Sequence, residues 1–257
     1  MKYKNLYVNG CSFTAGHCLN PSQTWSWEVN RDLNLEMYFS AKNGQSQESI
    51  TLSSINHLAN FDSQDTFVLI GITWKTRLGL AFDNLLLNLT LSDSIEKEDF
   101  NDKVGGHSRI SLPRTIGKVK NELQIATILA KEYQKNRENV NEVLRAYSNF
   151  FHKYIKHDSN IESNLSLKHV KEVLSLQSYL KSRRFKYIFV DFGGIFNDKY
   201  CLDIPSYKFL DQNNIVKFDW SMCKGLPDSG KIENHPNPEC HQEIAKLVKK
   251  LIKTKLI

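Results

Sequence analysis

The sequence lacks any long apolar stretch. No run of about 18 or more apolar residues, the length that crosses a bilayer, occurs among its 257 residues. We therefore expect no membrane span. The apolar stretch near the N-terminus is only a few residues long, and the turn Gly10-Cys11-Ser12 follows it at once. A signal peptide cleaved there would remove that turn, so we predict a cytoplasmic protein.

Cys-x-x-Cys pairs are also missing, and the five cysteines are an odd number. Neither a disulfide framework nor a structural zinc site is expected, and reduced thiols are the default in the cytosol. No acidic or histidine cluster has the spacing of metal ligands, so no metal is expected either. The sequence contains no internal repeat and no low-complexity tract.

Basic residues outnumber acidic ones, 34 to 28, which gives a formal net charge of +6. Much of the excess lies in two segments, 168–184 and 246–255, where lysines alternate with apolar residues. This pattern is typical of solvated helix faces, and no nucleic-acid-binding motif accompanies it. We expect no nucleic-acid partner, although the charge keeps that function as a weaker alternative.

Apolar runs that end in glycine or polar turns alternate along the chain with helical patterns. Strands are expected at 6–8, at a run ending near Ser40, at Phe67–Ile70, within 185–194 and within 214–220. Helices are expected at about 23–33, 51–61, 125–135, 140–155, 167–184 and 240–256. The unbroken apolar run Phe67–Ile70 is typical of a parallel strand covered on both faces.

This alternation predicts one α/β domain over 1–257, a three-layer α/β/α sandwich with a mostly parallel sheet of about five strands, flavodoxin-like in kind. A polar stretch within 78–115 breaks the pattern, and we expect a lid or insertion there. Ligands of open sheets bind at the carboxyl ends of the strands. Ser12, Gly44 and Thr73 follow predicted strands, so they are expected to meet at one edge.

Four blocks resemble, in order, those of the SGNH hydrolase superfamily, also called the GDSL family. They are YVNGCSFTAG, SAKNGQSQESI, Gly71-Ile72-Thr73 and ENHPNPECHQEIA. The resemblance implies that Ser12 is a nucleophile and His235 its base. It also implies an oxyanion hole made by backbone N–H groups of Ser12 and Gly44, with Thr73 at the position where the family has Asn.

The chemistry of these residue types supports the same roles. A serine hydroxyl is a poor nucleophile until an imidazole within hydrogen-bond reach takes its proton. The imidazole in turn needs an acceptor that fixes its tautomer. The family most often has Asp three residues before the histidine, but this chain has Ile232 there. Glu233 is the nearest carboxylate and our expected acid, and Asp228 is a more distant candidate.

Other departures from the family pattern leave alternatives open. Thr73 has a shorter reach than Asn, so Asn43 or another group is a possible donor in its place. Loss of one such donor typically costs about 100- to 1,000-fold in rate. Cys11 stands where the family has Asp, and a thiol nucleophile there would need a lowered pKa. The alternative with no catalytic role is that Ser12 serves only as the N-cap of the following helix.

Several further residues deserve a stated expectation. Trp74 and Arg77 follow the third strand and would hold a sugar, carboxylate or phosphate, unless they serve in packing and a surface ion pair. His241 is expected to cap a helix or lie on the surface. His17 and His57 are expected to be structural. Asp191 and Asp198 are expected to form turns, and lining the site or holding a metal as a pair are the alternatives.

Together these features predict a serine esterase that acts through an acyl-enzyme and needs no cofactor. The polar insertion and the pair Trp74 and Arg77 favour an O-acetyl group on a carbohydrate as the substrate. An O-acyltransferase is one alternative. The other is a catalytically weak or inactive protein that binds a glycan, motivated by Ile232 and Thr73.

Overall fold

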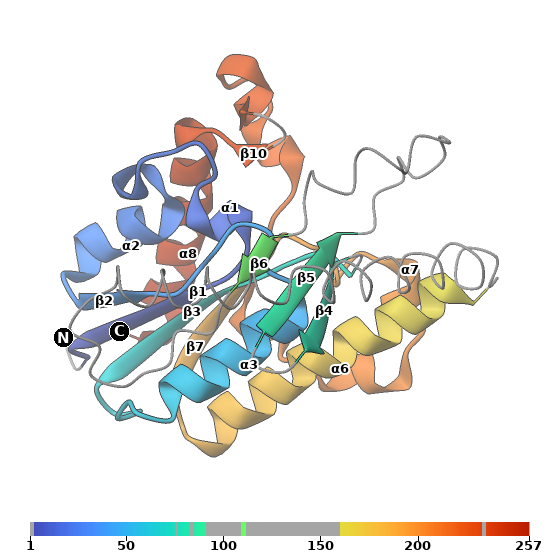
Figure 1. Ribbon diagram of the computed structural model, residues 1–257. Helices are drawn as coiled ribbons and strands as arrows, with labels where there is room; N and C mark the ends of the chain where they lie inside the picture. The colour runs from blue at the N-terminus through green and yellow to red at the C-terminus, as the bar shows by residue number, and fades with distance from the viewer. Residues whose placement is uncertain are drawn as a thin grey trace, which may run out of the picture.

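Figure 1 shows the computed structural model, which describes residues 3–75, 77–82, 85–90, 109–111, 160–232 and 235–256. The helices expected at 125–135 and 140–155 lie outside these ranges, as does Glu233. No helix in the described ranges is both long enough and apolar enough to span a bilayer.

A five-stranded sheet forms the centre of the molecule, in the order β2-β1-β3-β7-β8. Its strands are β1 Asn5–Asn9, β2 Glu36–Phe39, β3 Thr66–Ile72, β7 Lys186–Asp191 and β8 Ile215–Lys217. Every neighbouring pair is parallel. All seven residues of β3 are buried, as its unbroken apolar run predicts for a central parallel strand.

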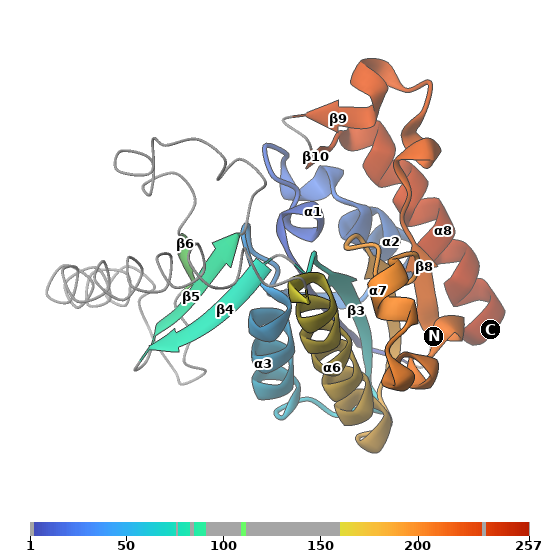
Figure 2. The same ribbon diagram turned by 90° about the vertical axis from the view of Figure 1, so that its right-hand side faces the viewer.

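Helices cover both faces of this sheet (Figures 1 and 2). One face carries α3 Gln47–Leu58 and α6 Ile161–Ser182, and the other carries α1 Ser12–Ala15, α2 Trp25–Leu33 and α8 Pro238–Leu256. The predicted three-layer α/β/α architecture is thus confirmed.

The basic residues and the apolar residues of α8 lie on different faces of the helix. Ile244, Val248 and Ile252 are buried at a spacing of four residues, while Lys246 and Lys250 are exposed. A helix repeats every 3.6 residues, so this spacing separates an apolar face from a basic one. The lysines of α8 thus lie on a solvent-facing side of the helix, and the absence of a nucleic-acid partner stays a prediction.

Shorter elements surround the main layers. They are α7 Lys199–Leu202, the 3-10 helices η1 Pro21–Gln23, η4 Pro205–Phe209, η5 Gln212–Asn214, η6 Trp220–Cys223 and η7 Pro227–Gly230, and the antiparallel pair β9 Lys231–Ile232 with β10 His235–Pro236. A separate antiparallel sheet contains β4 Arg77–Phe82, β5 Leu85–Thr90 and β6 Arg109–Ser111. We expected a loop or small insertion here, and the apolar residues within 78–89 were the signal for strands.

A disulfide bond joins Cys223 in η6 to Cys240 in α8, with Cα atoms 5.3 Å apart. The expectation of wholly reduced thiols is wrong for this pair. The two cysteines are 17 residues apart and belong to no recognisable motif, so their proximity depends on how α8 packs. Cys11, Cys18 and Cys201 are not in disulfide bonds.

The ends of β1 and β3 approach each other closely beneath α1. A Cβ atom added to Gly10 would lie 3.2 Å from the Gly71 Cα atom and would overlap the side chain of Thr14 on α1. A Cβ atom added to Gly71 would also overlap Thr14 Oγ1 and would lie 3.1 Å from the ring of Phe192. Glycine at both positions therefore lets α1 pack directly onto the sheet.

We predict that Gly71→Ala lowers the free energy of unfolding by about 1–3 kcal/mol, the usual cost of overfilling a packed core. Adding Thr14→Ala should recover at least half of this loss. Thr14 Oγ1 has no hydrogen-bond partner in the described part of the chain, so its removal costs little. Urea denaturation measures both effects. If Gly71→Ala lowers the free energy of unfolding equally in the wild-type and Thr14→Ala backgrounds, a contact other than that with Thr14 is responsible for the loss.

Candidate active site

Ser12 lies at the carboxyl edge of the sheet, directly after the turn that ends β1. It is the first residue of α1, its N-cap residue is Cys11, and its side chain is buried. The interpretation of Ser12 as the N-cap is therefore wrong. Cys11 is fully buried in the apolar core, which disfavours its thiol as the nucleophile.

The side chain of Asn9 holds the turn that precedes Ser12. Its Oδ1 atom accepts the N–H of Gly10 at 2.8 Å, and its Nδ2 atom donates to the hydroxyls of Ser53 and Ser54 on α3 at 2.9 Å each. This fully buried amide ties the strand end to α3, so the position of Ser12 is set by rigid elements.

His235 meets Ser12 although 223 residues separate them in the sequence. Its Nε2 atom lies 2.9 Å from Ser12 Oγ, within hydrogen-bond distance. The loop that carries His235 is held by β9–β10 pairing, in which His235 pairs with Ile232. It is also held by the Asn237 N–H, which donates to the Gly230 carbonyl at 2.8 Å.

No orienting acid can be assigned from the described residues. Glu233, the expected acid, lies outside them. Asp228 is exposed in η7, with a φ of +50°, and none of its described contacts reaches His235. Ile232 lies on β9 opposite His235. The role of Glu233 stays a prediction.

A second imidazole lies beside His235, which our sequence analysis missed. The ring of His17 is 4.6 Å from that of His235, centroid to centroid, and its Nδ1 atom lies 3.0 Å from Nδ2 of Asn43. We expected His17 to be structural. Its place shortly after α1, five residues beyond Ser12, was the available signal.

The predicted turn at Asn43 and Gly44 lies next to this pair. Backbone N–H groups of Ser40 and Lys42 donate to the carbonyls of Val8 and Gly10, at 2.8 and 3.1 Å, which holds the segment along the end of β1. Gly44 has a φ of +78°, a conformation that favours glycine. Asn43 contacts His17, and its role toward a substrate remains a prediction.

Thr73 follows β3 and is fully buried. Its N–H donates to Gln47 Oε1 at 3.2 Å. Its hydroxyl has no hydrogen-bond partner among the described residues, and neither has Gln47 Nε2. Buried polar groups are nearly always paired, and each exception costs about 1–3 kcal/mol. Gln47 was not among the predicted site residues.

An aromatic cluster centred on Phe13 lies beside His235. The ring of Phe13 contacts Trp74, His235 and Trp220 edge-on, at centroid distances of 4.6, 5.1 and 5.7 Å. Trp74 thus contacts the residue that follows Ser12, and its role toward a substrate stays a prediction. Trp220 from η6 was missed. The Arg77 side chain is outside what the structure describes.

Two other histidines have partners away from this chemistry. Nδ1 of His57 lies 3.2 Å from both the Tyr7 and Ser40 hydroxyls, which fits a structural role. His241 is fully buried, and its Nδ1 atom accepts the N–H of Trp25, the first residue of α2, at 3.1 Å. It therefore caps α2 and not α8, the helix that carries it, and the surface alternative is wrong. Burial, and secondly the nearby His235, lower the pKa of His241 to about 3.

The two aspartates near β7 also hold local structure. The buried carboxylate of Asp191 accepts the N–H groups of Ile195 and Phe196 at 3.2 Å each, and burial raises its pKa to about 6. Asp198 N-caps α7 and forms an ion pair with Lys75 at 2.5 Å. In the described ranges no three His, Cys, Asp or Glu side chains gather as a metal site would require.

No protein-family model matches the chain, and no curated protein matches its sequence. Solved esterases match it in structure over nearly the whole chain at low identity. The psychrotrophic esterase EstA from Pseudoalteromonas sp. is 10% identical, with 98% of each chain covered and a TM-score of 0.48.

Two further solved structures show a similar degree of likeness. An acetyl xylan esterase from the rumen bacterium Butyrivibrio proteoclasticus is 13% identical over 100% of this chain and 64% of its own, with a TM-score of 0.49. A member of the lipolytic protein G-D-S-L family from Veillonella parvula DSM 2008 is 11% identical over 98% and 97%, with a TM-score of 0.40. These values carry no residue role from one chain to another, so the roles proposed below depend on this chain's own geometry.

Proposed function

We propose that this protein is a serine esterase in which Ser12 is the nucleophile and His235 the general base. The observation that carries the proposal is the 2.9 Å distance between Ser12 Oγ and His235 Nε2, at the edge of a parallel sheet where ligands bind. A hydroxyl and an imidazole at this distance form the pair that nucleophilic catalysis requires.

The geometry supports a two-step reaction. Ser12 Oγ attacks the ester carbonyl carbon while His235 Nε2 takes the hydroxyl proton. The tetrahedral intermediate then collapses, the alcohol oxygen leaves with that proton, and the acyl group stays on Ser12 as an ester. In the second step His235 takes a proton from water, the hydroxide attacks the acyl-enzyme, and Ser12 regains its proton as the acid is released.

The negative charge on the carbonyl oxygen needs donors that are already in place. We propose the backbone N–H groups of Ser12 and Gly44 for this role, with the Thr73 hydroxyl as the third donor. The unpartnered state of the buried Thr73 hydroxyl supports this assignment, because a substrate oxygen would supply the missing acceptor. Glu233 is proposed as the residue that orients His235.

The aromatic surroundings favour a carbohydrate carrying a small O-acyl group such as acetyl. Trp74 and Trp220 are both partly exposed beside the Phe13 ring, and indole rings bury the apolar faces of sugars while leaving their hydroxyls in water. Lys231 lies 4.5 Å over the ring of Trp220 and brings a cation to the same side. Asn43 and Arg77 are further proposed contacts for the substrate.

Two other functions use the same site. If a second hydroxyl replaces water in the second step, the protein is an O-acyltransferase. If the oxyanion donors or the acid that orients His235 do not support catalysis, the protein binds an acylated glycan without hydrolysing it. Ile232 and Thr73, which stand where the family has Asp and Asn, motivate this alternative.

The test is hydrolysis of p-nitrophenyl acetate and of an acetylated sugar by purified protein. Ser12→Ala and His235→Gln should each lower kcat by about 10⁴-fold or more, since nucleophile and base act as a unit. His57→Gln is the matched histidine control and should keep kcat. Full activity after Ser12→Ala would overturn the proposal. An inactive wild-type protein that still binds the sugar would favour the binding alternative.

We further predict that Thr73→Val lowers kcat by about 100- to 1,000-fold, as loss of an oxyanion donor does elsewhere. The melting temperature should not fall, because valine has a similar shape and removes an unpartnered hydroxyl. Thr73→Ser keeps the hydroxyl and should keep most of kcat. Equal kcat values for the valine and serine variants would exclude Thr73 as a donor.

A further inference from the structure

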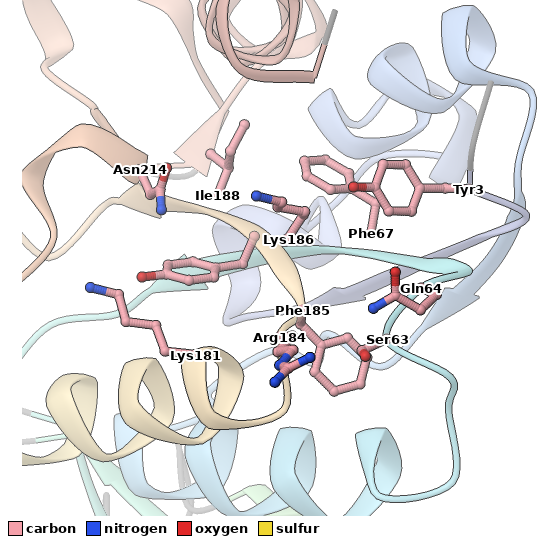
Figure 3. Close-up of a pocket in the computed structure, with 11 residues that line it drawn as sticks. Tyr3, Ser63, Gln64, Phe67, Lys181, Arg184, Phe185, Lys186, Ile188 and Asn214 are labelled. Atoms are coloured by element: carbon pink, nitrogen blue, oxygen red, sulfur yellow. The ribbon is translucent and has the colours of Figure 1, made fainter.

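A second concave site lies at the opposite edge of the sheet from Ser12. It is a cavity of about 480 Å³ at the amino ends of β3 and β7, beside the last turn of α6 (Figure 3). Pockets for small ligands typically measure about 300–1,000 Å³. The cavity is therefore large enough for one small molecule, and nothing in the proposed esterase reaction uses it.

Four aromatic side chains line this cavity, and among them only Tyr3 is partly exposed. Phe67, Phe185 and Tyr187 are all buried, and the ring of Tyr3 stands beside that of Phe67 with centroids 5.9 Å apart. Burial raises the pKa of Tyr187, so its phenol stays neutral at physiological pH. The partly exposed ring of Tyr3 is therefore the one that can stack against another planar ring.

The rim is cationic. Lys181, Arg184 and Lys186 line the cavity, all three are exposed, and none of the lining residues is acidic. Figure 3 shows Lys186 across the cavity from Lys181 and Arg184. Lys181 pairs with Asp211 at 3.1 Å, whereas neither Arg184 nor Lys186 has an ion-pair partner within the described ranges. Two cations are thus available to an anion at the mouth.

The backbone of Arg184 has a left-handed conformation that is uncommon for residues other than glycine. It follows α6 with a φ of +62°, and the Phe185 N–H closes the helix by donating to the Leu180 carbonyl at 2.9 Å. Helices normally place glycine, or sometimes asparagine, at such a position. The end of α2 follows this rule, with Asn34 at a φ of +51°. An arginine is less stable than a glycine in this conformation.

We propose that this cavity binds a small planar aromatic anion of nucleoside monophosphate size. Its ring would stack on the partly exposed ring of Tyr3, beside the buried rings of Phe67 and Phe185. Its anionic group would be held by Arg184 and Lys186, since a guanidinium suits phosphate and carboxylate oxygens. The same chemistry occurs at the end of a nucleic-acid strand, and the experiment below separates the two sources.

The test measures binding of AMP to the full chain by calorimetry at low salt. AMP should bind saturably, and adenosine and inorganic phosphate should each bind at least tenfold more weakly. Arg184→Gly should weaken AMP binding at least tenfold while the melting temperature stays equal or rises, because glycine suits the positive φ. Arg183→Ala removes the same charge from the neighbouring exposed residue, which does not line the cavity, and should leave the affinity unchanged. Ser12→Ala should also bind AMP normally.

Three results would overturn the proposal. They are the absence of saturable AMP binding, an equal affinity for inorganic phosphate, and an equal loss from Arg184→Gly and Arg183→Ala, which would indicate diffuse charge. An oligoadenylate that binds far more tightly than AMP would assign the site to a nucleic-acid strand and would contradict a free nucleotide.

Discussion

Helix α1 packs directly onto the ends of β1 and β3, and the position of the candidate active site depends on this contact. The contact is possible because Gly10 and Gly71 have no side chains at the place where the Thr14 side chain packs against the sheet. It places Ser12 at the carboxyl edge, within 2.9 Å of His235. A Cβ atom on either glycine would push α1 outward, and a shift of even one ångström would break that hydrogen bond.

The position of His235, the partner of Ser12, depends on the C-terminal part of the chain. His235 sits in a short hairpin whose neighbours, η6 and α8, are joined by the disulfide between Cys223 and Cys240. The aromatic cluster around Phe13 fills the space between this hairpin and the sheet. The candidate site is therefore assembled from the two ends of the chain, and each half is held by its own local packing.

Much of this could be predicted from the sequence, where local patterns determine the outcome. The apolar run of β3 fixes a buried parallel strand, and the serine after Gly10-Cys11 and the histidine before Pro236 stand out by their neighbours. The rest depends on distant contacts that no local pattern encodes. The disulfide is one example. The contacts of His17 with His235 and of Trp220 with Phe13 are others, because they form only when the two ends of the chain meet.

The central claim is that Ser12 is activated by its contact with His235, and covalent labelling tests it most directly. The intact mass of the protein would be measured after exposure to a small fluorophosphonate, alongside Ser12→Ala and Cys11→Ala. The account predicts a single adduct that is lost with Ser12→Ala and kept with Cys11→Ala. An adduct that survives Ser12→Ala, or none under conditions that label an active esterase, would contradict it.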